Sequence, residues 1–231
     1  PAPALALELA GESGISWLDP WAQVQPGGWQ YATAPAHPAS GWSARETLVP
    51  RGALEQLAAR ARAAGVALAG ADALEALRIA AWRPRHATEV DDRSIPHELD
   101  LLRSSVHLAK GCYRGQETVA KVHNLGAPPR RLALLHLDGS ESALPVAGDA
   151  VTFEGSEVGR VTAAAHHHDL GPVALAMLKR SAPADASLVV LAGDDDVPVA
   201  AAQQVLVPPS AGHAHRPPRL PRLGAVRRPT A

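Results

Sequence analysis

The sequence has one thiol, Cys112, in a short segment whose residue types could activate it. Lys110 and Arg114 lie two residues to either side, and their positive charges favour the thiolate form. Gly111 and Gly115 flank the thiol and can adopt positive φ, which permits a tight loop. The pattern predicts a reactive cysteine, although a buried and inert structural cysteine fits the same residues.

A helix is expected to begin directly after this loop, at Gln116, and to stop near residues 124–126. Glu117 and Lys121 lie one turn apart on this helix and have opposite charges. The positive end of the helix dipole would lie just after the thiol and would stabilise its charged form further. A single cysteine excludes an intramolecular disulfide and an all-cysteine zinc or iron–sulfur site within one chain.

Other polar residues suggest chemistry less clearly. His97-Glu98 begins like the helix of a zinc protease, but Leu101 stands where the second histidine would be, so that function is excluded. Glu98 could accept hydrogen bonds from a pterin ring, or it could be an acid stabilised at a helix start. Residues 166–168 are three histidines, which point alternately to opposite faces of a strand, so they cannot all bind one ion. No metal site is predicted.

The elements that must position these residues fall into two parts. Helices are expected over residues 51–64 and from Asp72, which has the capping-box spacing to Glu75, to about Trp82. From residue 130 onward, short apolar runs alternate with turn signals and predict an antiparallel barrel or sandwich. The runs span residues 132–137, 151–153, 158–165, 173–178, 188–191 and 199–207. The fold class is therefore α+β.

Composition limits the functional classes. The chain has 231 residues, 46% of them hydrophobic, and a net charge of −1, so direct DNA binding is not expected. Residues 209–231 are rich in proline and arginine and are expected to be a disordered tail. No apolar run approaches the roughly 20 residues of a membrane helix, and no signal peptide is visible. We therefore expect a cytoplasmic protein without a membrane partner.

Tryptophan is concentrated near the start of the chain, at positions 17, 21, 29 and 42. These side chains could form a surface on which a planar ligand stacks. Packing in the core is the favoured interpretation, because an indole buries a large area wherever it lies.

The cysteine segment resembles the signature of the YgfZ proteins, folate-binding relatives of the glycine-cleavage T-protein. That signature is carried here by Lys110-Gly111-Cys112-Tyr113-Arg114-Gly115-Gln116-Glu117. The likeness continues in residues 95–98, 122–126, 158–162 and 170–176, and covers roughly residues 15–207. True T-proteins lack the cysteine. The resemblance implies a partial T-protein-like folate-binding domain over residues 1–127 and a small antiparallel β-barrel over residues 128–208, before the tail.

The resemblance also implies a function. YgfZ proteins bind tetrahydrofolate, support the assembly or repair of iron–sulfur enzymes, and influence tRNA modification indirectly. The expected partners are folate and iron–sulfur proteins or their assembly factors. Cys112 matches the residue that the family needs for activity, and the site candidates around it are Lys110, Tyr113, Arg114, Gln116 and Glu117. Arg78 and Glu98 are the candidates for binding folate.

Two other functions stay open at the level of sequence. One is a folate-dependent aminomethyltransferase, which would need an acid or base rather than a thiol. The other is a non-catalytic scaffold, so whether the protein is an enzyme is undecided. YgfZ proteins have a further N-terminal stretch that supplies part of the folate pocket. For this reason, weak or absent folate binding is expected of the 231 residues alone.

Overall fold

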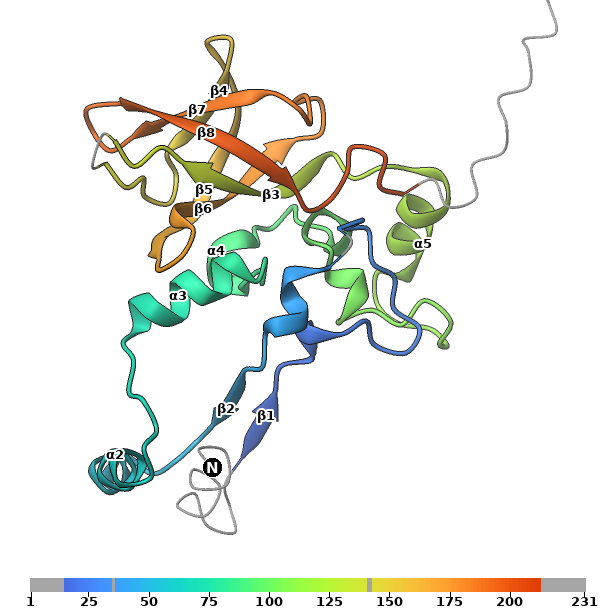
Figure 1. Ribbon diagram of the computed structural model, residues 1–231. Coiled ribbons are helices and arrows are strands. Elements are labelled where there is room, and N and C mark those ends of the chain that lie inside the picture. The colour runs from blue at the N-terminus through green and yellow to red at the C-terminus, as the bar shows by residue number, and fades with distance from the viewer. Residues whose placement is uncertain (1–14, 35, 141–142, 213–231) are drawn as a thin grey trace, which may run out of the picture.

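The computed structural model describes residues 15–34, 36–140 and 143–212, and its largest element is a closed six-stranded barrel (Figure 1). The strands are β3 (Arg130–Leu137), β4 (Ala150–Phe153), β5 (Ser156–His167), β6 (Gly171–Lys179), β7 (Ser187–Ala192) and β8 (Val197–Val205). They close in the order β3-β6-β5-β4-β7-β8, and every neighbouring pair is antiparallel. The predicted α+β class and the antiparallel barrel are confirmed. Most of the predicted tail, from residue 213, lies outside the described residues.

The burial of strand β3 on both of its sides explains why its sequence is apolar without alternation. Ala133 and Leu135 point into the barrel, whereas Leu132 and Leu134 point outward into a second core. Because successive side chains of a strand face opposite sides, a strand buried on both sides reads as a continuous apolar run. The barrel thus has one core inside it and shares a second core with the rest of the chain.

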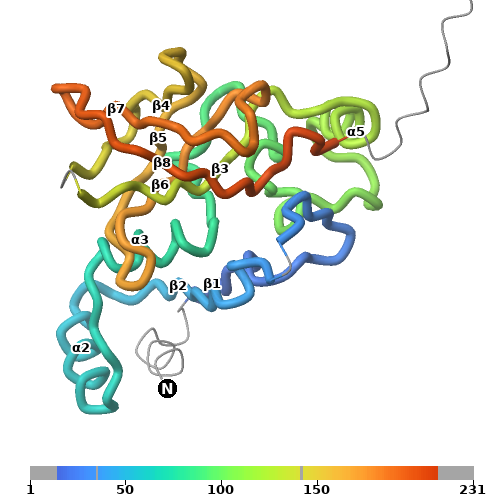
Figure 2. Tube along the Cα trace, turned by 45° about the horizontal axis from the view of Figure 1, so that its top comes forward, coloured from blue at the N-terminus to red at the C-terminus, as the bar shows by residue number. Residues whose placement is uncertain are grey.

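The N-terminal half forms a layer of short elements beside the barrel. Its strands β1 (Ser16–Leu18) and β2 (Arg45–Thr47) pair antiparallel, and its helices are α2 (Leu54–Ala63), α3 (Ala71–Ala80), α4 (His86–Glu89) and α5 (Gln116–Leu125). Five 3₁₀ turns connect them: η1 (Pro20–Ala22), η2 (Pro38–Gly41), η3 (Arg51–Ala53), η4 (Pro96–Leu99) and η5 (Leu101–Arg103). Helix α3 packs on β5 and β6, while α2 lies apart from the barrel (Figures 1 and 2).

The start of α3 corrects one expectation. The helix begins at Ala71 after Gly70, which provides no side-chain cap, so Asp72 lies inside the first turn. Glu75 does not fold back onto the N-cap, because both of its carboxylate oxygens accept hydrogen bonds from Arg78 and Arg85. The capping-box prediction was therefore wrong, although the predicted helix is present.

The core between the two parts contains large aromatic side chains. Trp21 and Trp82 are almost fully buried there, beside Ile79, Leu99 and Leu102. The indole N–H of Trp21 donates to the carbonyl of Ala81 at 2.9 Å. For Trp21, the packing interpretation is confirmed.

A buried polar network joins the N-terminal segment to the cysteine-bearing half. The carboxylate of Asp100 accepts the backbone N–H groups of Tyr31, at 2.7 Å, and Ala32, at 3.4 Å. Asp100 itself has φ of 54°, a left-handed conformation at the junction of η4 and η5. The hydroxyl of Tyr31 lies 3.0 Å from Nδ1 of His123 in α5. Side chains far apart in sequence thereby fix the position of α5.

The buried titratable groups predict a pH dependence of stability. Burial lowers the pKa of both His37 and His97 to about 4, and burial raises the pKa of Asp100 to about 7. Between about pH 5 and 6.5, unfolding therefore takes up protons on the two histidines, nearly two at about pH 5 and fewer above it, and releases up to one from Asp100. Because the unfolded state binds more protons, the free energy of unfolding should rise with pH across this window.

Two substitutions separate these contributions in urea unfolding at a series of pH values. His97→Gln should flatten the rise, because His37 and Asp100 then offset each other. Asp100→Asn should steepen it, because only the histidines remain. Identical slopes in the native protein and both variants would contradict the assignment.

Candidate functional site

Cys112 is exposed on the loop between η5 and α5, and the structure shows how this loop is closed. Helix α5 begins at Gln116 and ends at Leu125, as predicted. The side-chain oxygen of Gln116 accepts the N–H of Tyr113 at 3.1 Å, and the backbone N–H of Gln116 donates to the Tyr113 carbonyl at 3.3 Å. This reciprocal pair holds the turn that follows the thiol. Exposure rules out the buried structural cysteine.

A cavity of about 430 Å³ lies beside this loop. Three chain segments line it: residues 94–96, residues 105–107, and six residues from the loop and the first turn of α5, which form one wall. These six are Lys110, Tyr113, Arg114, Gly115, Thr118 and Val119. Three of the lining residues, His107, Lys110 and Arg114, have basic side chains. The ammonium group of Lys110 lies 5.2 Å from the ring centre of Tyr113, a cation–π contact.

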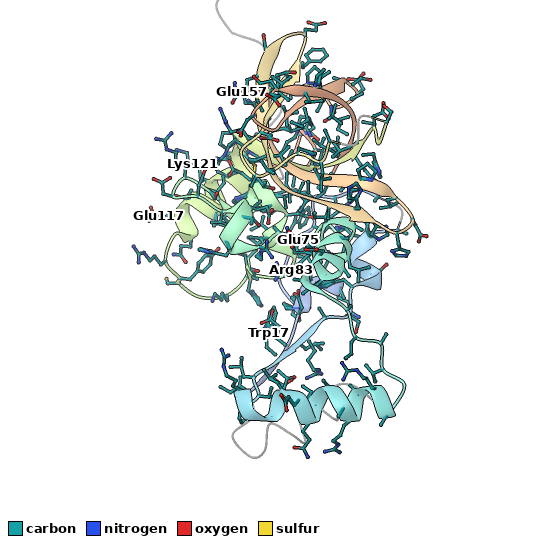
Figure 3. The ribbon with its side chains drawn as sticks, turned by 90° about the vertical axis from the view of Figure 1, so that its left-hand side faces the viewer. Trp17, Glu75, Arg83, Glu117, Lys121 and Glu157 are labelled. Carbon is teal, nitrogen blue, oxygen red and sulfur yellow. The ribbon has the colours of Figure 1, made fainter. Side chains whose placement is uncertain are left out.

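Of the six site candidates predicted from the sequence, only some line the cavity. Lys110, Tyr113 and Arg114 line the cavity. Cys112 is next to it in the chain without being one of its lining residues, and Gln116 serves to close the turn. Glu117 is exposed on α5, as is Lys121, and both lie at the surface of the molecule (Figure 3).

The two glycines that flank the thiol provide a matched test of the loop. Gly115 has φ of 85°, whereas Gly111 is outside the left-handed region, and a Cβ atom would meet nothing within 4 Å at either position. Gly115→Ala should therefore lower the free energy of unfolding by about 1–2 kcal/mol, because an L-residue is strained at this φ. Gly111→Ala should change it by less than about 0.5 kcal/mol. Equal effects in thermal unfolding would contradict this account of the loop.

Arg78 lines a second cavity, of about 500 Å³, that lies near α3 and the two-stranded sheet. Its guanidinium donates to Glu75 and Glu89 and to the carbonyl of Arg83. Glu75, Arg83 and Trp17 also line this cavity, and Figure 3 shows Glu75 and Arg83 next to each other, with Trp17 below them in that view. Arg78 is thus buried in an ion-pair network that shapes the cavity.

The aromatic set predicted as a possible stacking surface is only partly assembled. Trp17 and Trp42 both line the second cavity. Trp21 is in the core, and Trp29 lies against the ring of His123, with 5.1 Å between the ring centres.

Glu98 is fully buried, and its carboxylate is bound by Arg130 of β3. The distances are 3.1 Å from Nε to Oε1 and 2.9 Å from Nη2 to Oε2. Arg130 also binds the exposed carboxylate of Asp91, at 2.6 Å, and the hydrogen bonds that its guanidinium donates to Asp91 and Glu98 raise the pKa of Arg130. Glu98 lines neither of these two cavities, so the structure does not bring it together with Arg78.

Sequence reasoning missed Arg130 as a partner of the site. It is separated from Glu98 by 32 positions and is the first residue of β3, a place where an arginine forms no distinctive sequence pattern. The only local signal is that Arg130 and Arg131 are two charged residues placed directly before a strongly apolar run. That signal indicates an unusual environment without indicating the partner.

The fold is similar to a solved structure of aminomethyltransferase T of the glycine cleavage system, from Bartonella henselae. The TM-score is 0.54 at 18% identity, and the match covers 69% of this chain and 44% of that one. At this identity the likeness concerns the fold alone, which is T-protein-like.

Two sequence comparisons show which proteins the chain resembles in sequence. Residues 130–209 match the family model described as the C-terminal beta-barrel domain of CAF17. A chloroplastic protein of Arabidopsis thaliana, named as a transferase, is 32% identical over 152 residues, which are 62% of this chain and 32% of the relative. The chain spans about a third of that relative. The chain is therefore similar to CAF17 proteins in its barrel and T-protein-like in its fold, and membership of the YgfZ family stays a prediction.

The compartment also stays a prediction. Within residues 15–34, 36–140 and 143–212, no helix has both the length and the apolar character needed to cross a membrane. The chloroplast in the relative's name is a statement about that relative.

Proposed function

We propose that the protein binds tetrahydrofolate and supports the assembly or repair of iron–sulfur proteins, with an indirect influence on tRNA modification. The observation that carries this proposal is the exposed Cys112 on its closed loop, within a T-protein-like fold that has a CAF17-type barrel. An exposed thiol is accessible to a protein partner. One thiolate is far short of the usual four cluster ligands, so Cys112 would act together with an iron–sulfur protein or an assembly factor.

The second cavity has side chains that suit a folate. Its volume of about 500 Å³ is within the range of small-molecule sites. The indole rings of Trp17 and Trp42 offer apolar faces for a planar pterin, and Arg45 offers a guanidinium for the carboxylates of the glutamate tail. When bound, tetrahydrofolate supplies the capacity to carry a one-carbon group. Arg78 would keep the wall of this cavity in place through Glu75 and Glu89.

Calorimetric titration of tetrahydrofolate into the full-length product of the gene tests the folate part of the proposal. We expect binding, and a higher melting temperature because the ligand stabilises the folded state by mass action. Trp17→Ala should weaken binding about tenfold through lost stacking. The matched control is Trp29→Ala, because Trp29 is 47% exposed and Trp17 is 45% exposed, but only Trp17 lines the cavity. No binding at millimolar tetrahydrofolate would remove the folate assignment.

A further inference from the structure

The cavity beside Cys112 differs in charge from the other two cavities. Its lining includes the basic side chains of His107, Lys110 and Arg114 and no acidic side chain. The second cavity has charges of both signs in its lining: Arg45, Arg78, Arg83 and Arg85 together with Asp19, Glu46 and Glu75. A third cavity, of about 290 Å³ near α4 and strands β5 and β6, is likewise mixed, with Arg130, Arg160 and Lys179 beside Glu89, Asp91 and Glu157. The charge of the first cavity is therefore not balanced by its own walls.

The partners of the three basic side chains show which of them could bind an anion. Among the described residues, neither Arg114 nor Lys110 has an ion pair, and the ammonium group of Lys110 lies over the ring of Tyr113. The ring of His107 packs over Gly27, where a Cβ atom would approach it to within 2.4 Å. Nδ1 of His107 accepts the N–H of Ala109 at 3.2 Å. The histidine is thus fixed in the wall, while the two longer side chains are available to a ligand.

The backbone adds donors on the same side. Gly115 occupies the N-cap of the ten-residue helix α5 and has no side chain that could cap it. The oxygen of Gln116 is used by Tyr113, so it does not cap the helix either. The first turn of α5, which includes the lining residue Thr118, therefore presents uncapped N–H groups and the positive end of the dipole. Anions bind favourably in such a position.

The walls also show what kind of anion would fit. Ile95, Pro96, Val106 and Val119 contribute apolar surface. A volume of about 430 Å³ is within the range for small organic ligands and exceeds what an inorganic ion requires. A fork of guanidinium donors suits a carboxylate or a phosphate group.

We infer that this cavity binds a small organic anion next to the loop that carries Cys112, so that the reactant of the thiol is negatively charged. The inference rests on the proposed role of Cys112 and specifies the class of its reactant. The shared chemistry of that class is an apolar body of a few carbon atoms with a carboxylate or phosphate group.

Two alkylating reagents of nearly equal size test the inference on the full-length protein. Iodoacetate is an anion and iodoacetamide is neutral. In both reactions the thiolate sulfur forms a bond to carbon and iodide leaves. Peptide mass spectrometry gives the rate at Cys112, and the iodoacetate-to-iodoacetamide rate ratio is compared with that of N-acetylcysteine. We expect a ratio about tenfold higher for Cys112, with the excess falling at high salt.

Matched variants assign the preference to the cavity. Arg114→Gln and Lys110→Gln should each reduce the ratio toward that of the free thiol. Lys121→Gln, an exposed cation on α5 that does not line the cavity, should leave it unchanged. A change in the thiolate fraction alters both rates equally, so the ratio isolates recognition of the anion. Competition by glutarate or by propyl phosphate then distinguishes a carboxylate site from a phosphate site.

The outcomes separate this inference from the proposed function. A ratio equal to that of N-acetylcysteine, with normal reactivity toward iodoacetamide, overturns the inference and leaves a reactive Cys112. A raised ratio that Arg114→Gln and Lys110→Gln do not change also overturns it. Failure of Cys112 to react with either reagent contradicts both the inference and the proposed function.

Discussion

Replacing Arg130 with methionine is expected to lower the free energy of unfolding by about 3–5 kcal/mol. Arg130 is the cation bound to the fully buried carboxylate of Glu98, through Nε at 3.1 Å and Nη2 at 2.9 Å. Its removal leaves that carboxylate in the interior without a positive partner. The loss of an ion-pair partner from the interior is much more costly than the loss of an exposed pair.

Urea unfolding of three variants measures this effect. Asp91→Asn is the matched control, because it removes the other carboxylate bound to Arg130. The side chain of Asp91 is 49% exposed, so this substitution should lower the free energy of unfolding by less than about 1 kcal/mol. Adding Glu98→Gln to Arg130→Met should restore part of the loss, because the buried charge is then absent. A loss for Arg130→Met no larger than that for Asp91→Asn would contradict the assigned role of the pair.

The barrel could be predicted because its signals are local. Apolar runs of strand length and the turns between them are sufficient to place all six strands, as in β6, where the predicted run 173–178 lies within Gly171–Lys179. Strand β2 gave no such signal. Its residues, Arg45, Glu46 and Thr47, are polar and largely exposed, and they form a strand only because they pair with β1.

The candidate site was predictable where it is continuous in sequence. Residues 110–117 carry the thiol, the cations and the start of α5 together, so their types and spacing identify the loop. The cavity was not predictable, because residues 94–96 and 105–107 reach it only through the fold. The ion pair of Glu98 with Arg130 was not predictable for the same reason, because the two residues meet only through the fold. Arg78 and Glu98, the two candidates for binding folate, do not share a pocket in the described residues, since each is held in a separate ion-pair network.

Replacing Cys112 with alanine should abolish the support of iron–sulfur enzymes and leave the fold intact. The side chain is exposed, and an exposed substitution away from caps and ion pairs changes stability by no more than about 0.5 kcal/mol. The loss would then come from the sulfur atom, since no other cysteine exists in the sequence to replace it. Melting temperatures of the native protein and the variant establish that the variant is folded.

The activity of iron–sulfur enzymes in a strain that lacks the gene tests the central claim most directly. The strain carries a plasmid with the native protein, Cys112→Ala, Cys112→Ser or the surface control Lys121→Gln, and the activities are compared with those of enzymes that have no cluster. The account predicts that the native protein and Lys121→Gln restore the cluster enzymes, whereas both cysteine variants, present at equal abundance, do not. Full restoration by Cys112→Ala would contradict the account and would favour a scaffold that needs no thiol.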